Sequence, residues 1–265
     1  MSGLVDRYDL VILDLDGVVV LGDRPIPGAP QAVNRLRQSG KTVRFATNNA
    51  SRRAAEVARL LVGIGIEAAE SEVLTSAGAA AAMLGRKLPP AAPVLVIGAP
   101  ALAEEVAAQG LRTVGSADAG PVAVIQGYGP DVGWRDLAEA CLAVRAGALW
   151  VATNTDRTLP TPRGALPGNG ALVAALATAL DRQPDVVVGK PEPELFLAAA
   201  RDTGAQRSLV VGDRLDTDIA GAHRAGMDSL LVLTGVADER ALSLVPPDKR
   251  PTYVAPNLSG LWDVA

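Results

Sequence analysis

Leu10-Val11-Ile12-Leu13-Asp14-Leu15-Asp16-Gly17 is the stretch that decides the fold, because four aliphatic residues run directly into two acids and a glycine. The apolar run predicts a buried strand. Side chains alternate between the two faces of a strand, so Asp14 and Asp16 can converge on one site only if the strand ends and the backbone turns. Gly17 supplies the freedom for that turn. Ligands bind at strand ends in open α/β sheets, so the two acids indicate a metal-assisted reaction in which one acid attacks and the other moves protons.

Short aliphatic runs alternate with helical patterns along the chain, which predicts βαβ units, a doubly wound parallel sheet and an α/β fold. The runs show little polar alternation, as in sheets that are covered on both faces. The expected strands are residues 10–13, 42–46, 94–97, 122–125, 149–152, 186–188, 209–211 and 229–233. The expected helices are residues 32–38, 51–63, 101–108, 134–146, 172–180, 194–203 and 217–225.

Two proline-containing stretches suggest that one domain is inserted into another. Residues 87–93 precede a fresh strand, and residues 181–185 precede the strand that leads to Gly189-Lys190-Pro191. We therefore expect a core domain formed by residues 1–77 and 186–265, interrupted by a separate α/β domain at residues 78–185. The core sheet would then resume with the strand at 186–188.

The composition narrows the class of protein. The chain has 265 residues, of which 49% are hydrophobic and 20% charged, as is typical of a globular protein with a sizeable core. The net charge is −4 and there is no block of Lys and Arg, which argues against nucleic-acid and membrane-surface partners. Cys141 is the single cysteine, which fits a reducing compartment. We find neither a signal peptide nor a bilayer-spanning apolar run, and expect a cytoplasmic protein.

Polar residues stand at the carboxyl ends of four expected strands. They are Asp14-Leu15-Asp16-Gly17, Thr47-Asn48-Asn49, Gly189-Lys190-Pro191 and Gly212-Asp213-Arg214-Leu215-Asp216-Thr217-Asp218. In a parallel sheet these ends face the same edge, so they can meet in one crevice. Carboxylates, a hydroxyl, amides and an ammonium are the groups that phosphoryl transfer requires, because the transferring group carries negative charge that a metal and a fixed cation must neutralise. Each motif alone is also typical of a turn or a solvated loop, but the four together in this order indicate a catalytic site.

These four motifs resemble those of the haloacid-dehalogenase-like phosphohydrolases, in the class with a large C2-type cap between the second and third motifs. The similarity extends to Pro27-Gly28-Ala29, Thr47-Asn48-Asn49-Ala50-Ser51, Leu166-Pro167-Gly168-Asn169-Gly170 and the run from Gly212 to Ile219. Within the class, the chain is most similar to subfamily IIA, which contains p-nitrophenyl phosphatases, phosphoglycolate phosphatases and nucleotide-sugar-operon phosphatases. The resemblance implies a Rossmann-like core with an inserted α/β C2-type cap, and a Mg²⁺-dependent phosphatase.

The resemblance, combined with the chemistry of the residues, implies a set of roles. Asp14 would attack phosphorus and form an aspartyl-phosphate. Asp16 would protonate the leaving alkoxide and then take a proton from the hydrolytic water. Lys190 would neutralise charge and keep Asp14 ionised. Relatives that cleave carbon–halogen bonds lack the second acid, so Asp16 favours a phosphatase.

The resemblance also implies ligands for the metal and the phosphoryl group. Asp14, the Asp16 backbone carbonyl and Asp213 would hold Mg²⁺. Asp216 or Asp218 would hold a metal-bound water or orient Lys190, and both alternatives stay open. The groups expected to contact phosphate or substrate are Thr47, Asn48, Asn49, Lys190, Asn154, Asp156, Arg157 and Gly168.

The substrate is expected to be a small phosphorylated metabolite, chosen by the cap. Residues 145–154 and 164–170 resemble the caps of bacterial glycerol 3-phosphate phosphatases, which makes glycerol 3-phosphate the first candidate. The alternatives are phosphoglycolate and a broad activity on p-nitrophenyl, sugar and nucleotide phosphates. A phosphoacceptor signalling domain also clusters Asp, Thr and Lys at strand ends, but it would lack Asp16 and be far shorter. Because cap-mediated dimers are common in the resembled subfamily, a homodimer through the cap is a further expectation.

Overall fold

The computed structural model describes residues 3–161 and 163–263, which form two contact units. The first unit consists of the described residues up to Thr47, residues 55–74 and the chain from Lys190 onward; the second consists of residues 48–54 and 75–189. The strands are β1 Leu10–Leu13, β2 Val20–Leu21, β3 Arg24–Pro25, β4 Thr42–Thr47, β5 Val73–Thr75, β6 Pro93–Ile97, β7 Arg112–Val114, β8 Ala123–Gln126, β9 Leu149–Ala152, β10 Thr158–Thr161, β11 Gly164–Pro167, β12 Val186–Val187, β13 Ser208–Gly212, β14 Asp228–Val232 and β15 Tyr253–Ala255.

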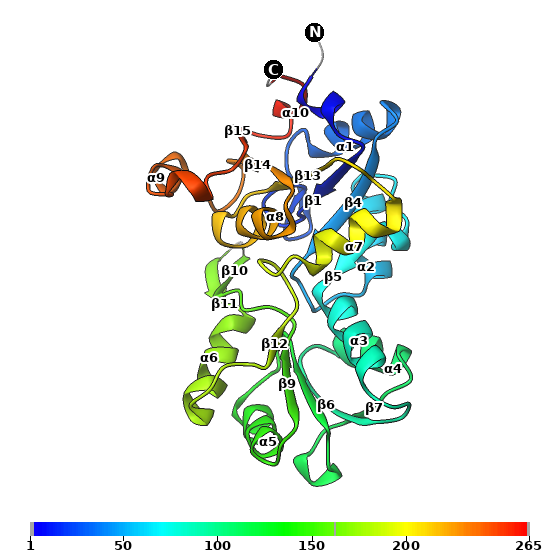
Figure 1. Cartoon of the computed structure of the whole chain (residues 1–265), viewed down its shortest axis with the longest axis vertical. Helices are drawn as coiled ribbons and strands as arrows, with labels where there is room; N and C mark the ends of the chain where they lie inside the picture. Colours follow the sequence, from blue (N-terminus) through cyan, green and yellow to red (C-terminus); the bar gives the residue numbers. More distant parts are fainter. Residues whose placement is uncertain (1–2, 162, 264–265) are drawn as a thin grey trace. The chain divides into compact units, whose positions relative to one another are not determined.

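The helices alternate with these strands (Figure 1). They are α1 Ala29–Gln38, α2 Ala54–Gly63, α3 Ser76–Lys87, α4 Pro100–Ala108, α5 Trp134–Arg145, α6 Asn169–Leu180, α7 Glu194–Thr203, α8 Ala220–Ala225, α9 Glu239–Ser243 and α10 Gly260–Asp263. Short 3-10 turns occur at Leu4–Arg7, Glu70–Glu72, Ala117–Ala119 and Pro247–Lys249, and a π turn, η4, spans Leu215–Ile219. Among the helices of the described residues, none combines the length and apolar character that a membrane crossing requires.

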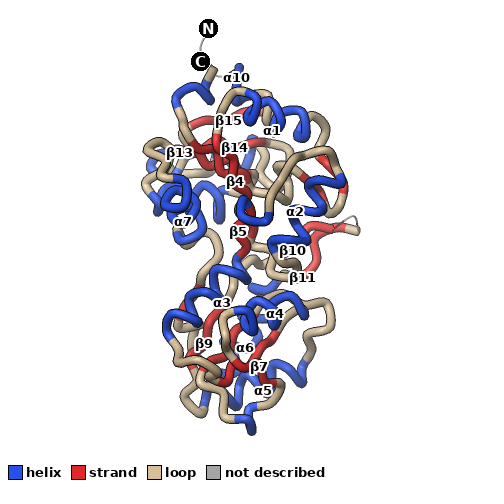
Figure 2. The backbone as a smooth tube through the Cα atoms, turned by 90° about the vertical axis from the view of Figure 1, so that its right-hand side faces the viewer, coloured by secondary structure: helices blue, strands red, loops and turns tan. Residues whose placement is uncertain are grey.

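The first unit is built on a six-stranded sheet with the order β15-β14-β13-β1-β4-β5. β1 lies in its middle and pairs in parallel with β13 on one side and β4 on the other. All four residues of β1 are buried, because helices cover both faces of this sheet. Figure 2 shows α7 on one side of the sheet and α1 and α2 on the other. The carboxyl ends of β1, β4 and β13 therefore open onto the same edge.

The second unit has its own parallel sheet, with the order β12-β9-β8-β6-β7. Alternate strand residues face two separate cores, as the period of two requires. Val94, Ile125 and Val151 pack with α3 and α4. Their chain neighbours Leu95, Val124 and Trp150 pack with α5 and α6. The expected α/β architecture is confirmed for both sheets.

The strand before Gly189 lies in a different sheet from the one we expected. β12 pairs with β9 of the second unit, so the prediction that residues 186–188 resume the first sheet is wrong. The physical reason is that Val187 and its neighbours Val186 and Val188 pack into the two cores of the second sheet. Lys190 therefore follows a strand of the second unit but belongs by its contacts to the first.

Candidate active site

Four buried charged side chains form one cluster in the first unit, and we call Asp14, Lys190, Asp213 and Asp218 the charged cluster. Asp14 follows β1, Asp213 follows β13, and Asp218 lies in the η4 turn. Their exposed fractions are 7% for Asp14, 3% for Lys190, 1% for Asp213 and 0% for Asp218. Burying charges is costly unless they are paired, so these contacts determine what the cluster can do.

Lys190 is the cation of the charged cluster. Its Nζ donates to Asp14 Oδ1 at 2.6 Å, to Asp218 Oδ1 at 2.7 Å and to the Ala46 carbonyl at 3.3 Å. Burial alone would lower the pKa of Lys190, but the two carboxylates outweigh it and hold that pKa above its ordinary value. Lys190 is therefore a fixed positive charge between two carboxylates.

Asp14 is subject to opposing influences. Burial raises the pKa of the Asp14 carboxyl well above its ordinary value, and the neighbouring Asp218 adds to that rise, while Lys190 opposes it. The Asp14 backbone N–H donates to the Val211 carbonyl at 2.9 Å, which fixes the end of β1 against β13. The nucleophile expected from the sequence is thus held rigidly, and Lys190 is what favours its ionised form.

Asp213 has the features of a metal ligand. Its Oδ2 accepts the Val236 N–H at 2.6 Å, while Oδ1 is buried without a hydrogen-bond partner among the described residues. Burial and Asp218 together raise the pKa of Asp213 to about 6. Asp14, Asp213 and Asp218 each offer a carboxylate oxygen, and these oxygens lie within 4.8 Å of one another. Clustered carboxylate oxygens with an unsatisfied acceptor fit a hard divalent cation such as Mg²⁺.

Glycines allow the backbone to approach these carboxylates closely. A Cβ at Gly17 or Gly235 would collide with the Asp213 carboxylate, and one at Gly212 would collide with Asp218. Gly17 also has φ +89°, a conformation that side chains disfavour. The Gly17 predicted to turn the chain after the first motif therefore also makes room for Asp213.

Asp16, Thr47 and Asp216 complete the predicted residues of the first unit. Asp16 is half-buried and forms an isolated backbone β-bridge with Val20 in the turn after β1. Thr47 is the last residue of β4 and is 2% exposed. Asp216 points to solvent and accepts from the Arg214 guanidinium at 3.1 and 2.8 Å. Of the two acids left open by the sequence, Asp218 is therefore the one that contacts Lys190.

A second group of predicted residues comes together inside the second unit. Asn48 Nδ2 donates to both carboxylate oxygens of Asp156, at 3.1 and 3.0 Å. The Asn48 carbonyl accepts from Asn154 Nδ2 at 2.7 Å and from Ser76 Oγ at 2.7 Å. Asn154 is 3% exposed. Sequence reasoning missed Ser76, although a Thr-Ser pair at the start of an alanine-rich helix is a recognisable capping signal.

The remaining predicted residues of the second unit lie in turns. Asn49 is half-buried, and its Oδ1 accepts from the N–H and the hydroxyl of Ser51, at 2.9 and 2.6 Å. Arg157 is exposed, and its carbonyl accepts the Gly168 N–H at 3.0 Å. A Cβ at Gly168 would collide with the Asp156 carbonyl. Gly168 therefore allows the chain after β11 to pack closely against the loop after β9.

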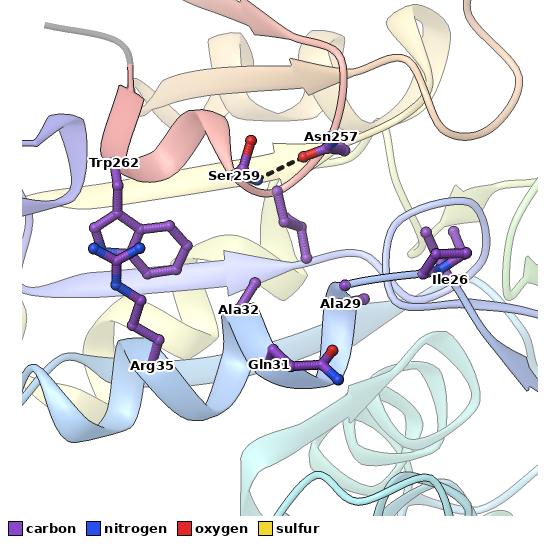
Figure 3. A pocket seen from close by; sticks show the side chains of 11 residues that line it. Ile26, Ala29, Gln31, Ala32, Arg35, Asn257, Ser259 and Trp262 are labelled. Carbon is purple, nitrogen blue, oxygen red and sulfur yellow. Dashed lines mark hydrogen bonds between the residues drawn. The ribbon is translucent and has the colours of Figure 1, made fainter.

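A pocket of about 320 Å³ lies elsewhere on the first unit, between the start of α1 and the segment leading into α10. Figure 3 shows the Arg35 guanidinium over the Trp262 ring, 4.2 Å from its centroid. Ser259 N–H donates to Asn257 Oδ1 at 2.8 Å. The residues that line this pocket include none of the predicted site residues, so it is distinct from the charged cluster.

Comparison with known proteins agrees with this geometry. Residues 11–112 match the family profile "Haloacid dehalogenase-like hydrolase", and residues 187–261 match a HAD-hydrolase-like profile. The chain is 50% identical to a D-glycerol 3-phosphate phosphatase of Mycobacterium tuberculosis, over 98% of this chain and 73% of that protein.

Solved structures show the same likeness. The fold is similar to that of the glycerol phosphate phosphatase from M. tuberculosis in complex with magnesium, with a TM-score of 0.92 and 49% identity over 99% of this chain and 79% of that one. It is also similar to a 4-nitrophenylphosphatase from Thermotoga maritima, with a TM-score of 0.89 and 30% identity over 97% of both chains. The chain belongs to the haloacid dehalogenase-like hydrolases.

Proposed function

We propose that this chain is a Mg²⁺-dependent phosphatase that hydrolyses glycerol 3-phosphate through an aspartyl-phosphate intermediate. The observation that carries the proposal is the charged cluster, in which a buried ammonium lies between Asp14 and Asp218 beside the unsatisfied oxygen of Asp213. The 50% identity to a glycerol 3-phosphate phosphatase supports the choice of substrate.

The reaction has two steps that these residues can perform. An Asp14 carboxylate oxygen forms a bond to phosphorus while the bond to the leaving alkoxide breaks, and Asp16 gives that alkoxide its proton. Asp16, now ionised, then takes a proton from water as the water attacks phosphorus and releases inorganic phosphate and Asp14. Lys190 keeps Asp14 ionised and offsets the negative charge that develops on the phosphoryl oxygens. The Thr47 hydroxyl, the Asn48 amide and Asn49 are the proposed phosphoryl-oxygen contacts.

Asp14, the Asp16 carbonyl and Asp213 are the proposed Mg²⁺ ligands. The ion would neutralise charge on the phosphoryl group and on the carboxylates around it. Asp218 is the proposed orienting residue for Lys190, because its Oδ1 accepts from Nζ while its Oδ2 accepts the Arg214 N–H at 3.1 Å. Asp216 faces solvent and takes no part in this proposal.

We assign residues 78–189 to a C2-type cap and residues 1–77 and 190–265 to the core, because β12 pairs with β9 of the second unit. The separation of the chain into two contact units supports this division, although those units also place residues 48–54 and 75–77 with the cap segment. Arg157 and the turn at Gly168 are the proposed cap contacts for substrate, together with Asp156. A homodimer through the cap and a cytoplasmic location complete the proposal.

A phosphate-release screen on the purified full chain tests the function. It would compare glycerol 3-phosphate with phosphoglycolate, sugar phosphates, nucleotides and p-nitrophenyl phosphate at saturating Mg²⁺. The proposal predicts the highest kcat/KM for glycerol 3-phosphate. A higher kcat/KM for phosphoglycolate, or similar values for all compounds, would overturn glycerol 3-phosphate as the substrate. Absence of phosphate release from every compound would overturn the phosphatase activity.

A further inference from the structure

The segment after β4 belongs to the second unit, and its first residue is Asn48. Thr47 ends β4 in the first unit, yet Asn48 and the residues up to Ala54 group with the second. Ala50 is fully buried in the core formed by α3 and α4. The chain therefore changes units immediately after the last residue of the strand, at the peptide that joins Thr47 to Asn48.

Ser76, Asn154 and Asp156 all bind Asn48, and we call these residues the Asn48 clamp. Ser76 Oγ and Asn154 Nδ2 both donate to the Asn48 carbonyl, each at 2.7 Å. Asp156 accepts from Asn48 Nδ2 with both carboxylate oxygens. The clamp thus binds the main chain and the side chain of the same residue.

Asn154 is itself held on both sides. Its Oδ1 accepts the Asp156 N–H at 3.1 Å, and its own carbonyl accepts from Asn169 Nδ2 at 2.7 Å. Asn169 is 1% exposed and begins α6. Both ends of the Asn154 amide are therefore engaged inside the protein, which gives Asn154 a supporting position and not one open to a substrate.

The clamp has a direct geometric consequence for the phosphate-contacting segment. A carbonyl oxygen offers two lone pairs, and here two buried donors occupy the Asn48 oxygen. Because the peptide unit is planar and trans, fixing this oxygen also fixes the Asn49 N–H, which points the opposite way. The segment Asn48-Asn49 thus presents its amide groups in one orientation, without the cost of ordering them when a ligand binds.

We propose that Asn154 is a positioning residue that orients the Asn48-Asn49 peptide for phosphate, acting through the Asn48 clamp. This rests on the proposed function, in which Asn48 and Asn49 contact the phosphoryl oxygens. Asn154 donates a neutral hydrogen bond to main chain, so its loss leaves the charged cluster unchanged and affects how the phosphoryl group is held. The expected signature is weakened phosphate binding with a smaller change in kcat.

Calorimetric titration of the Mg²⁺-saturated full chain with inorganic phosphate, alongside steady-state kinetics, provides the test. Asn154→Ala should weaken the Kd for phosphate and raise the substrate KM by about tenfold, and Ser76→Ala by about threefold. In the double variant, the Kd for phosphate should rise by at least the product of the two single effects. Val144→Ala is the matched control, since it opens a cavity in the core between β8 and α5 away from Asn48; it should lower Tm and leave the Kd unchanged.

The outcomes separate this proposal from the proposed function. If Asn154→Ala and Val144→Ala have the same phosphate Kd at equal loss of Tm, the positioning role is overturned. If Asn154→Ala does not fold, Ser76→Ala decides alone, and an unchanged Kd overturns the proposal. If the wild-type protein binds phosphate but releases none from any substrate, the proposed phosphatase activity is refuted. The Kd values of the variants would still test the positioning role of Asn154. Wild-type protein that hydrolyses substrate but shows no phosphate binding would refute the clamp only.

Discussion

The charged cluster and the Asn48 clamp are both buried polar networks, but they are built from different groups. The charged cluster joins three carboxylates to one ammonium, and its pKa values are displaced: Asp14 and Lys190 lie above their ordinary values, and Asp213 is raised to about 6. In the clamp, one amide and one hydroxyl donate to the Asn48 carbonyl, and the Asp156 carboxylate accepts from the Asn48 side chain. Displaced pKa values are characteristic of groups that do chemistry, whereas neutral hydrogen bonds fix geometry without changing charge.

The two networks should respond differently to substitution. Removing one partner of a buried ion pair leaves an uncompensated charge. Removing one neutral donor from a carbonyl that has a second donor costs far less. Substitutions in the charged cluster should therefore change rate or stability by large amounts, and those in the clamp should change binding by modest ones.

Asp14→Asn should have the largest effect on rate. The amide cannot form the acyl phosphate, so kcat should fall by about 10⁴-fold or more. Because burial and Asp218 disfavour the Asp14 carboxylate, the neutral variant should keep its fold. Phosphate release and the thermal unfolding midpoint would be measured on the same sample. Retained activity would show that another residue is the nucleophile.

Lys190→Met should have the largest effect on stability. It leaves the Asp14 and Asp218 carboxylates buried without their cation and should lower the free energy of unfolding by about 3–5 kcal/mol. Arg201→Met is the control, because Arg201 pairs with Glu194 at the surface and should cost less than about 1 kcal/mol. Urea unfolding of both variants gives the comparison. Equal losses in the free energy of unfolding would mean that the buried carboxylates do not depend on Lys190 for their stability.

Mg²⁺ should affect both activity and stability. EDTA should abolish phosphate release and Mg²⁺ should restore it, and activity that persists in chelator would remove the metal from the proposal. Burial and Asp218 raise the pKa of Asp213 from 3.8 to about 6. A carboxyl whose pKa is raised by folding contributes stability below its unfolded pKa, and that stability is lost as the pH rises through the folded value.

The pH dependence of Mg²⁺ binding follows from this loss of stability on ionisation of Asp213. Without the ion, ionisation of Asp213 between about pH 4 and 6 should destabilise the protein, and Mg²⁺ should reverse this because it binds the ionised form. The rise in Tm on adding Mg²⁺ should therefore be several degrees larger at about pH 7.5 than at about pH 5. The same rise at both pH values would contradict the assignment of Asp213 as a ligand.

Asp216 and Asp218 give the smallest and sharpest comparison, because they are two residues apart. Asp218→Asn removes the negative charge of the carboxylate whose Oδ1 accepts from Lys190 Nζ, and it should lower kcat by about tenfold or more, with a loss of stability. Asp216→Asn affects an exposed pair with Arg214 and should change kcat by less than about twofold. Phosphate-release kinetics of the two variants test this directly. Equal losses of kcat would show that Asp216 also contributes to the active site.

The parts of the fold that could be predicted are those with local signals. The run 10–13 is apolar throughout and too short for a typical helix, so it predicted β1 and the position of Asp14 directly after it. The edge strands β5 (Val73–Thr75) and β15 (Tyr253–Ala255) were missed, since each has only 3 residues and their stability comes from pairing. The hairpin of β10 and β11 was missed as well, because most of its residues face solvent and show no apolar pattern.

The parts that could not be predicted depend on partners distant in sequence. Val186 and Val187 are equally apolar whichever sheet they join, so their pairing with β9 had no sequence signal. Asp216 and Asp218 are both acids of the η4 turn, and the packing of that turn buries Asp218 and exposes Asp216. Asn154 was predicted as a substrate contact, whereas its amide binds the Asn48 carbonyl 106 positions earlier.

Mass spectrometry of acid-quenched enzyme tests the central claim most directly. The full chain would be mixed with glycerol 3-phosphate and Mg²⁺, quenched on the millisecond timescale and digested. Phosphoryl transfer to Asp14 predicts that the peptide containing Asp14 gains the mass of one phosphoryl group in wild-type protein and not in Asp14→Asn. Phosphate release with no modified peptide, or with the phosphoryl group on another residue, would contradict the account.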